Sequence, residues 1–367
     1  MVGSSTNNPK AVAVLSKIIN MAEKLGASDI HMRSGGPVMV RIDGSVVEMQ
    51  GSLPAFEEGQ LISMMKGVLP SQRMDEFLNT NQVDAAFAAT NGPRVRINMY
   101  RQLGRTAVVM RIINSEILTV DQLQLPPQLS AISKFRRGIV IFSGATGSGK
   151  STSMASILDD INHTRSEHIL TIEDPIEYQF TEDKCIISQR EVGTDVMSFN
   201  DAIRSALRED PDIILMGEMR DYESIEFALE LAETGHLVFS TLHAPTAVES
   251  ISRMVSSFPP EGQSAMRNKL AQNLRMVIAQ RLVKRNPRGR IAACEVMTVN
   301  ELVSEMIMDP DKTHEIEELL KGEDAIEGML HFDEHLRQLA EAETITTAVA
   351  LDNASSRTDL ELKLQGF

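Results

Sequence analysis

The sequence Gly-Ala-Thr-Gly-Ser-Gly-Lys-Ser-Thr, at Gly144–Thr152, decides the fold of this chain. It fits the phosphate-loop pattern G-x-x-x-x-G-K-[ST], and the residues at the defining positions are Gly144, Gly149, Lys150 and Ser151. An apolar run of strand length, Ile139–Ser143, precedes it, and the pattern of Ser151–Ile161 predicts a helix after it. This strand, loop and helix are the context that the motif requires.

The residue types of the loop predict how it binds a nucleotide. Glycines allow consecutive backbone N–H groups to point inward, and the following helix adds the positive end of its dipole. We expect Lys150 to reach the β- and γ-phosphates of ATP, and the Ser151 hydroxyl to ligate Mg²⁺. A Gly-rich turn without a ligand would explain neither side chain. The predicted nucleotide-binding residues of the loop are Gly144, Ala145, Thr146, Gly147, Ser148, Gly149, Lys150, Ser151 and Thr152.

Composition limits the class of protein. The 367 residues carry a formal net charge of −15, which argues against a nucleic-acid binder because such proteins need clustered Lys and Arg. Cys185 and Cys294 lie far apart in sequence and indicate neither a zinc site nor a disulfide framework. No stretch approaches the ~18 apolar residues of a membrane span, so we expect no integral membrane segment and a cytosolic setting.

The pattern of the chain predicts an α/β protein of several parts. We expect a flexible tail at 1–10, a smaller α+β domain at 11–116, a linker at 117–129, an ATPase domain at 130–297 and a helical region at 298–367. In the ATPase domain, strands alternate with helices, which is typical of a mainly parallel sheet covered on both faces. The spacing of the apolar residues of Ala265–Leu282 predicts one further helix, packed in the core.

Two predicted strands end in carboxylates. Glu218 follows the apolar run Ile213–Gly217, and we expect it to orient and deprotonate the attacking water. In the common form of this strand end in phosphate-loop NTPases, an Asp precedes the Glu, whereas this chain has Gly217 at that position. We therefore expect Ser151 and water to provide more of the Mg²⁺ ligands. Glu173 ends Ile169–Glu173 and is expected to join the magnesium and water network. The alternatives are a helix-initiating carboxylate for Glu218 and a solvated turn for Glu173.

Two histidines mark the ends of the predicted strand Leu237–Thr241. We expect His243, at the carboxyl end, to sense the γ-phosphate or an interface. His236 is a candidate for nucleotide binding, and a structural histidine is the alternative.

Arginines gather in the first domain of this otherwise acidic chain. We expect Arg96 and Arg111 to deliver charge to the γ-phosphate from a mobile domain, which would couple nucleotide state to domain angle. An ion-paired strand surface is the alternative for each. A second basic cluster is expected to be a solvated edge, with a subunit or membrane contact as the alternative: Arg281, Lys284, Arg285, Arg288 and Arg290.

These motifs, in this order, resemble the type II/IV secretion ATPase superfamily, and within it the PilT/PilU twitching-motility ATPases. The resemblance rests on the phosphate loop, the acidic segment Glu173–Glu177, Gly217-Glu218 and the two-histidine segment Thr234–His243. Further similar segments are Ala27–His31, Ser188–Gly193, Ala206–Asp212 and Asp359–Leu364.

The resemblance implies a PAS-like N-terminal domain, a RecA-like ATPase domain and a helical C-terminal region, assembled as a homo-hexamer. It implies ATP-driven motion passed to an inner-membrane pilus platform protein, from a cytoplasmic position at the pilus base. The two cysteines favour pilus retraction, because the extension ATPases usually carry a tetracysteine zinc site. Asn300–Ile307 departs from the PilT pattern and is closer to PilU-like proteins, so the alternatives are an accessory motor acting with a second retraction ATPase, or an ATP-gated scaffold.

Overall fold

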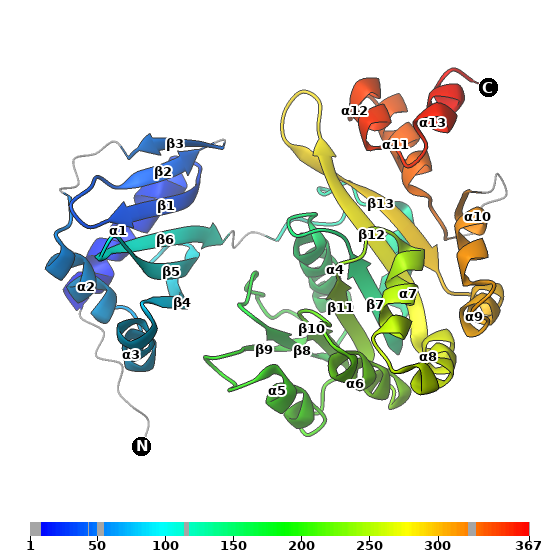
Figure 1. The fold of residues 1–367 in the computed structure, drawn as a ribbon, viewed down its shortest axis with the longest axis horizontal. Coiled ribbons are helices and arrows are strands. Elements are labelled where there is room, and N and C mark those ends of the chain that lie inside the picture. Colours follow the sequence, from blue (N-terminus) through cyan, green and yellow to red (C-terminus); the bar gives the residue numbers. More distant parts are fainter. Residues whose placement is uncertain (1–8, 43, 50–54, 114–116, 322–327, 367) are drawn as a thin grey trace. The chain divides into compact units, whose positions relative to one another are not determined.

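The chain forms two compact units, Met1–Glu116 and Ile117–Phe367, in a computed structural model that describes residues 9–42, 44–49, 55–113, 117–321 and 328–366 (Figure 1). Both units combine helices with a sheet, and the α/β fold class predicted from the sequence is confirmed. Most of the predicted tail and Asp43, expected in a strand-connecting turn, lie outside the described residues.

The N-terminal unit is built on an antiparallel sheet of six strands in the order β3-β2-β1-β6-β5-β4. Its core contains alternate strand residues such as Ile30, Ile97 and Met110, together with Leu15 and Ile18 of the first helix. The strands are β1 (Ala27–Arg33), β2 (Met39–Ile42), β3 (Ser45–Glu48), β4 (Gln82–Ala88), β5 (Arg94–Gln102) and β6 (Arg105–Ile113). The helices are α1 (Pro9–Lys24), α2 (Glu58–Lys66) and α3 (Ser71–Thr80).

The second unit contains a sheet of seven strands in the order β13-β12-β7-β11-β10-β8-β9. All neighbours are parallel except β12 and β13, which pair antiparallel. The strands are β7 (Gly138–Ser143), β8 (His168–Glu173), β9 (Ile186–Glu191), β10 (Ile213–Met216), β11 (Leu237–Leu242), β12 (Leu274–Lys284) and β13 (Arg290–Thr298).

Helices cover both faces of this sheet, as the alternation of β7 shows. Ile139 and Ile141 pack into the core formed with α6, α7 and α8, whereas Val140 and Phe142 pack into the core formed with α4. The phosphate-loop strand is therefore buried on both sides. The bounds are η1 (Pro127–Lys134), α4 (Lys150–Thr164), α5 (Phe199–Ala206), α6 (Tyr222–Glu233), α7 (Ala247–Ser256) and α8 (Pro260–Asn273).

The helix predicted over Ala265–Leu282 is wrong in its second half. The helix α8 ends at Asn273, and the chain continues directly into β12, which pairs with β7 on one side and β13 on the other. Residues of a central strand are apolar on both faces, so their spacing also fits a helical stripe.

Of the C-terminal helices, Phe332–Glu341 and Thr347–Asn353 pack onto the β12–β13 hairpin, whereas Glu301–Met308 packs against α8 (Figure 1). Beyond β13 the sheet has no further strand in the described residues. The outer edge of β13 is covered: Leu330 forms a bridge with Val296, and the Cys294 backbone N–H donates to His335 Nδ1 at 2.9 Å. The elements are α9 (Glu301–Met308), η2 (Thr313–Glu315), α10 (Ile316–Lys321), α11 (Phe332–Glu341), α12 (Thr347–Asn353) and α13 (Arg357–Leu364). Within the described ranges, no helix has the length and hydropathy to cross a membrane.

Candidate nucleotide site

The phosphate loop connects β7 to α4, as its sequence predicts. Gly144 and Gly149 adopt φ angles of 138° and 94°, which side chains rarely tolerate. A Cβ atom on Gly144 would lie only 2.4 Å from the main-chain oxygen of Gln280 in β12. Glycine is thus required here both by conformation and by the close approach of β12.

Lys150 is folded over the loop that precedes it. Its Nζ donates to the carbonyl oxygens of Gly144 at 2.8 Å and Ala145 at 3.0 Å. Burial lowers the pKa of Lys150, and the carboxylates of Glu218 and Glu177 partly oppose this effect. A bound phosphate would offer this desolvated ammonium group charged oxygens, which are stronger acceptors than carbonyls.

A cavity of about 860 Å³ opens above the loop. Of the predicted nucleotide-binding residues, it is lined by Thr146, Gly147, Gly149, Lys150, Ser151 and Thr152. Gly144, Ala145 and Ser148 belong to the loop but not to the cavity wall. The predicted carboxylates Glu173 and Glu218 and the predicted sensor His243 line the same cavity.

Glu218 and His243 face one another. Glu218 Oε1 lies 3.1 Å from His243 Nε2, and Arg220 Nε donates to Oε2 at 2.8 Å. Both residues are held by short connections from the carboxyl ends of β10 and β11: α6 begins after the cap Asp221, and α7 after the cap Thr246. The Thr241 hydroxyl of β11 donates to the Gly217 carbonyl oxygen at 2.7 Å, and this bond links the end of β11 to the connection that follows β10.

Glu173 is held more deeply in the site. The Thr171 hydroxyl donates to its Oε1 at 2.8 Å, and the Glu177 backbone N–H donates to its Oε2 at 3.4 Å. Burial raises the pKa of Glu173 to about 7. A cation bound nearby would therefore favour the ionised carboxylate that it needs as a partner.

His236 lies away from this cavity, at the opposite end of β11 from His243. Its Nδ1 lies 2.8 Å from the Leu231 carbonyl oxygen and 3.1 Å from the Thr234 hydroxyl. The structure therefore does not bring His236 to the phosphate loop of its own chain.

Arg96 and Arg111 lie opposite one another on neighbouring strands of the N-terminal unit. Arg111 Nε donates to Asp29 Oδ1 at 2.9 Å, and Arg96 Nε is 3.7 Å from Asp84 Oδ1. Although burial acts to raise the pKa of Asp29, the hydrogen bonds from Ser28 and Arg111 leave it lowered. Both arginines remain largely exposed, so their guanidinium groups retain access to a further anion.

Arg290 and Tyr178 are among the cavity residues that were not expected from the sequence. Arg290, assigned there to a solvated edge, lines the cavity because it pairs with Lys284 at the end of β12. The hydroxyl of Tyr178 lies 2.8 Å from Thr152 Oγ1. If 274–284 had been recognised as a strand, Arg290 could have been expected at the cavity. Its partner Lys284 lies two residues from Leu282, which also lines the cavity, and residues two apart in a strand point to the same face of the sheet.

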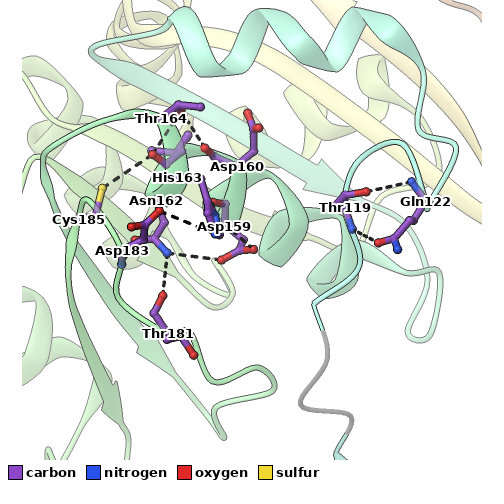
Figure 2. A network of polar contacts seen from close by, with 11 residues as sticks. Thr119, Gln122, Asp159, Asp160, Asn162, His163, Thr164, Thr181, Asp183 and Cys185 are labelled. Atoms are coloured by element: carbon purple, nitrogen blue, oxygen red, sulfur yellow. Dashed lines mark hydrogen bonds and ion pairs between the residues drawn. The ribbon is translucent and has the colours of Figure 1, made fainter.

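The segment that carries Tyr178 is tied to the far end of α4 by Asn162. Figure 2 shows this buried amide donating to the Thr181 carbonyl oxygen, at 2.8 Å, and the Asp183 N–H donates to its Oδ1 at 3.1 Å. The Lys184 N–H adds a bond to the Asn162 carbonyl oxygen at 3.0 Å. The helix that begins at the phosphate loop therefore also fixes the connection between β8 and β9.

The donor groups of the cavity fit Mg²⁺ bound together with a nucleotide. In the part of the chain that the structure describes, no cluster of three or more His, Cys, Asp or Glu could hold a metal. Mg²⁺ keeps several waters and usually takes one or two protein ligands plus substrate phosphates. The Ser151 hydroxyl and the carboxylates of Glu173 and Glu218 are oxygen donors of the kind it prefers.

Comparison with known proteins gives a consistent result. Residues 5–364 match the family model of the type II/IV secretion system protein. The chain is 41% identical to the type IV pilus retraction ATPase PilT of Pseudomonas aeruginosa, over 80% of this chain and 85% of that protein. It is 35% identical to the type IV pilus ATPase PilU of the same organism, over 95% of this chain and 91% of that protein.

Solved structures agree with these sequence matches. A crystal structure of the pilus retraction motor PilT with bound ADP has a TM-score of 0.88 at 38% identity, over 95% of this chain and 99% of that one. The ATPase DotB of Legionella pneumophila has a TM-score of 0.80 at 26% identity, over 97% of this chain and 96% of that one. The resemblance predicted from the motifs is confirmed.

Proposed function

The chain belongs to the type II/IV secretion system protein family, and from that membership we propose that it is an ATP-hydrolysing motor of type IV pilus retraction. The observation that carries the proposal is the cavity in which the phosphate loop, Glu218 and His243 meet. A loop that holds phosphates beside a carboxylate able to activate water has the two parts that hydrolysis of a γ-phosphate needs.

In the proposed reaction, the loop amides and Lys150 bind the β- and γ-phosphates and stabilise the charge that develops on them. Glu218 orients the attacking water and accepts its proton. Its pairing with His243 and Arg220 holds the carboxylate in place before substrate binds. Bound through Ser151 and the substrate phosphates, Mg²⁺ would supply charge neutralisation, with Glu173 in its outer network.

The N-terminal arginines provide the coupling step of the proposal. Arg96 and Arg111 contact the γ-phosphate in one position of the N-terminal unit and leave it in another, so that hydrolysis changes the preferred domain angle. The motor acts as a homo-hexamer and passes this motion to an inner-membrane pilus platform protein, from a cytoplasmic position at the pilus base. We assign His236 a structural role at the start of β11, because its Nδ1 lies 2.8 Å from the Leu231 carbonyl oxygen of the same chain.

A second candidate is an accessory motor that assists another retraction ATPase. The PilU similarity, which extends over 95% of this chain, supports it. Purified protein distinguishes the two: a primary motor hydrolyses ATP steadily on its own, whereas an accessory protein needs its partner for full turnover.

The central test is the substitution Glu218→Gln, which keeps the side-chain size and removes the base. We expect the hydrolysis rate to fall by about 100-fold or more, the range attributed to general-base catalysis, while ATP still binds. Glu226→Gln, on the exposed face of α6, is the control and should leave the rate unchanged. Near-normal hydrolysis by Glu218→Gln would refute the assignment of the base.

A further inference from the structure

The side chain of Gln280 is buried in the wall between the phosphate loop and the hairpin, outside the residues that line the cavity. It is 1% exposed, and its Nε2 donates to Ser153 Oγ in the first turn of α4 at 2.8 Å. The same amide nitrogen lies 3.6 Å from Cys294 Sγ on β13. The amide nitrogen of Gln280 thus has partners on two different elements, whereas its buried Oε1 has no hydrogen-bond partner among the described residues.

The strand that carries Gln280 touches both ends of the phosphate loop. At the start of the loop, the Gln280 main-chain oxygen leaves no space for a side chain on Gly144. At its end, Leu282 lies within 3.4 Å of the position that a Cβ atom on Gly149 would take. The Gln280–Ser153 hydrogen bond lies beside these two approaches and joins the strand to the helix.

Gln280 is itself held from the other side. It pairs in register with Cys294 of β13, and the Cys294 N–H donates to His335 of α11. The strand β12 also pairs along β7, with Ala279 opposite Ser143 just before the loop. Because β12 is paired on both sides and packed tightly, it cannot shift when the loop moves. A side chain fixed on it can therefore hold the loop in one position.

We propose that Gln280 is a positioning residue for the phosphate loop, which it holds in its phosphate-binding geometry through Ser153. This inference rests on the proposed function, since it concerns the same nucleotide. Gln280 makes no contact with the substrate; it keeps the first turn of α4, and with it the loop N–H groups, at a fixed distance from β12. Loss of the bond should therefore weaken ATP binding more than it affects the rate of the bound complex.

The test is a double-mutant cycle with Gln280→Leu, Ser153→Ala and the double variant. We expect each single substitution to raise the Kd of Mg-ATP by about ten-fold, equivalent to ~1.4 kcal/mol, with kcat changed by no more than about two-fold. The double variant should bind ATP no more weakly than the weaker single variant, because both remove the same bond. Inorganic tripolyphosphate should show the same losses, since the loop and not the nucleoside is affected.

Asn273→Leu is the matched control. Asn273 also carries a buried amide; it is the last residue of α8, directly before β12, and its Nδ2 donates to the Lys269 carbonyl oxygen away from the cavity. This variant should lose thermal stability without losing ATP affinity. If Gln280→Leu does not fold, Ser153→Ala alone decides the result.

Three results would overturn the inference: unchanged ATP affinity in the single variants, additive losses in the double variant, or an equal loss of affinity in Asn273→Leu. Failure of the proposed function is seen separately, because it would appear in the wild type as absence of ATP hydrolysis, whatever the behaviour of Gln280.

Discussion

At the scale of single residues, the phosphate loop could be predicted because its chemistry is local. Consecutive residues provide the backbone amides, Lys150 and Ser151, so no knowledge of the tertiary fold is needed. Glu218, Glu173 and His243 could be expected near one another because each ends a recognisable apolar strand, and ends of parallel strands meet at one edge of a sheet; all three line the cavity, while their roles stay predictions. Arg290 was not placed at the site, because its position depends on its pairing with Lys284 in a hairpin whose first strand was expected to be mostly helix.

The position of Arg290 leads to a prediction. A guanidinium group on the cavity wall should attract the polyphosphate or the nucleoside of ATP, so Arg290→Ala should raise the KM for ATP by about ten-fold with little change in kcat, as loss of uniform binding does. Steady-state hydrolysis at varied ATP concentration measures both constants.

Arg285→Ala provides the control for this prediction. Arg285 belongs to the same hairpin, carries the same charge and does not line the cavity. Equal effects of the two substitutions would mean that the hairpin acts only through its net charge.

At the scale of elements, the sequence separates strands from helices well where a short apolar run is bounded by turn residues or a polar cluster. The strands expected at Ile139–Ser143 and Ile169–Glu173 and the helix expected over Ser151–Ile161 lie within β7, β8 and α4. Around 274–284 the same reasoning failed, because a strand buried by neighbours on both sides and by helices on both faces has no polar alternation. The error mattered for the site, since β12 forms the wall behind the loop.

The helix α4 carries a prediction of its own at Asn162. Removing this buried amide with Asn162→Ala leaves the Asp183 N–H and the Thr181 carbonyl without their partners, at a cost of about 2 kcal/mol in the free energy of unfolding. Amide hydrogen exchange should also become faster in the segment from Tyr178 to Cys185. Asp160→Ala, at an exposed position of the same helix, should change neither quantity.

Equal exchange rates in the Asn162→Ala and Asp160→Ala variants would show that the β8–β9 connection is fixed by other contacts. Tyr178 would then reach Thr152 without help from the far end of α4.

At the scale of the whole molecule, changes of pattern along the sequence predicted five parts, and the structure forms two compact units. The contacts that join the C-terminal helices to the sheet could not be predicted. These contacts depend on side chains such as His335, which lie in helices without any distinguishing motif. Assembly into a hexamer and coupling to a platform protein come from the family and remain proposals.

One of these contacts makes stability depend on pH. Burial lowers the pKa of His335 to about 4, so that the folded protein keeps it neutral where the unfolded chain, near 6.5, becomes protonated. The unfolded state binds more protons in this window, so the contribution of His335 is complete above pH 6.5 and is lost as the pH falls towards 4.

The variant His335→Gln isolates this effect. The difference in unfolding free energy between wild type and variant should shrink as the pH falls from 6.5 to 4, by up to about 1.4 kcal/mol per pH unit. Denaturant unfolding at several pH values measures it. The raised pKa values of Glu173 and Glu295 act in the opposite direction but cancel in the difference, because both proteins contain them. A constant difference across this range would contradict the prediction.

The cover that Leu330 and His335 place over the edge of β13 also protects the chain from association with itself. An uncovered edge strand presents free N–H and C=O groups to any other strand, and β13 is almost entirely apolar between Ile291 and Met297. A chain truncated after Thr298 would expose that edge along with the apolar surface beneath the lost helices. Such a truncated chain should aggregate through strand pairing. A loss of ATPase activity in it would therefore be explained by aggregation and would not show that the C-terminal helices take part in the motor.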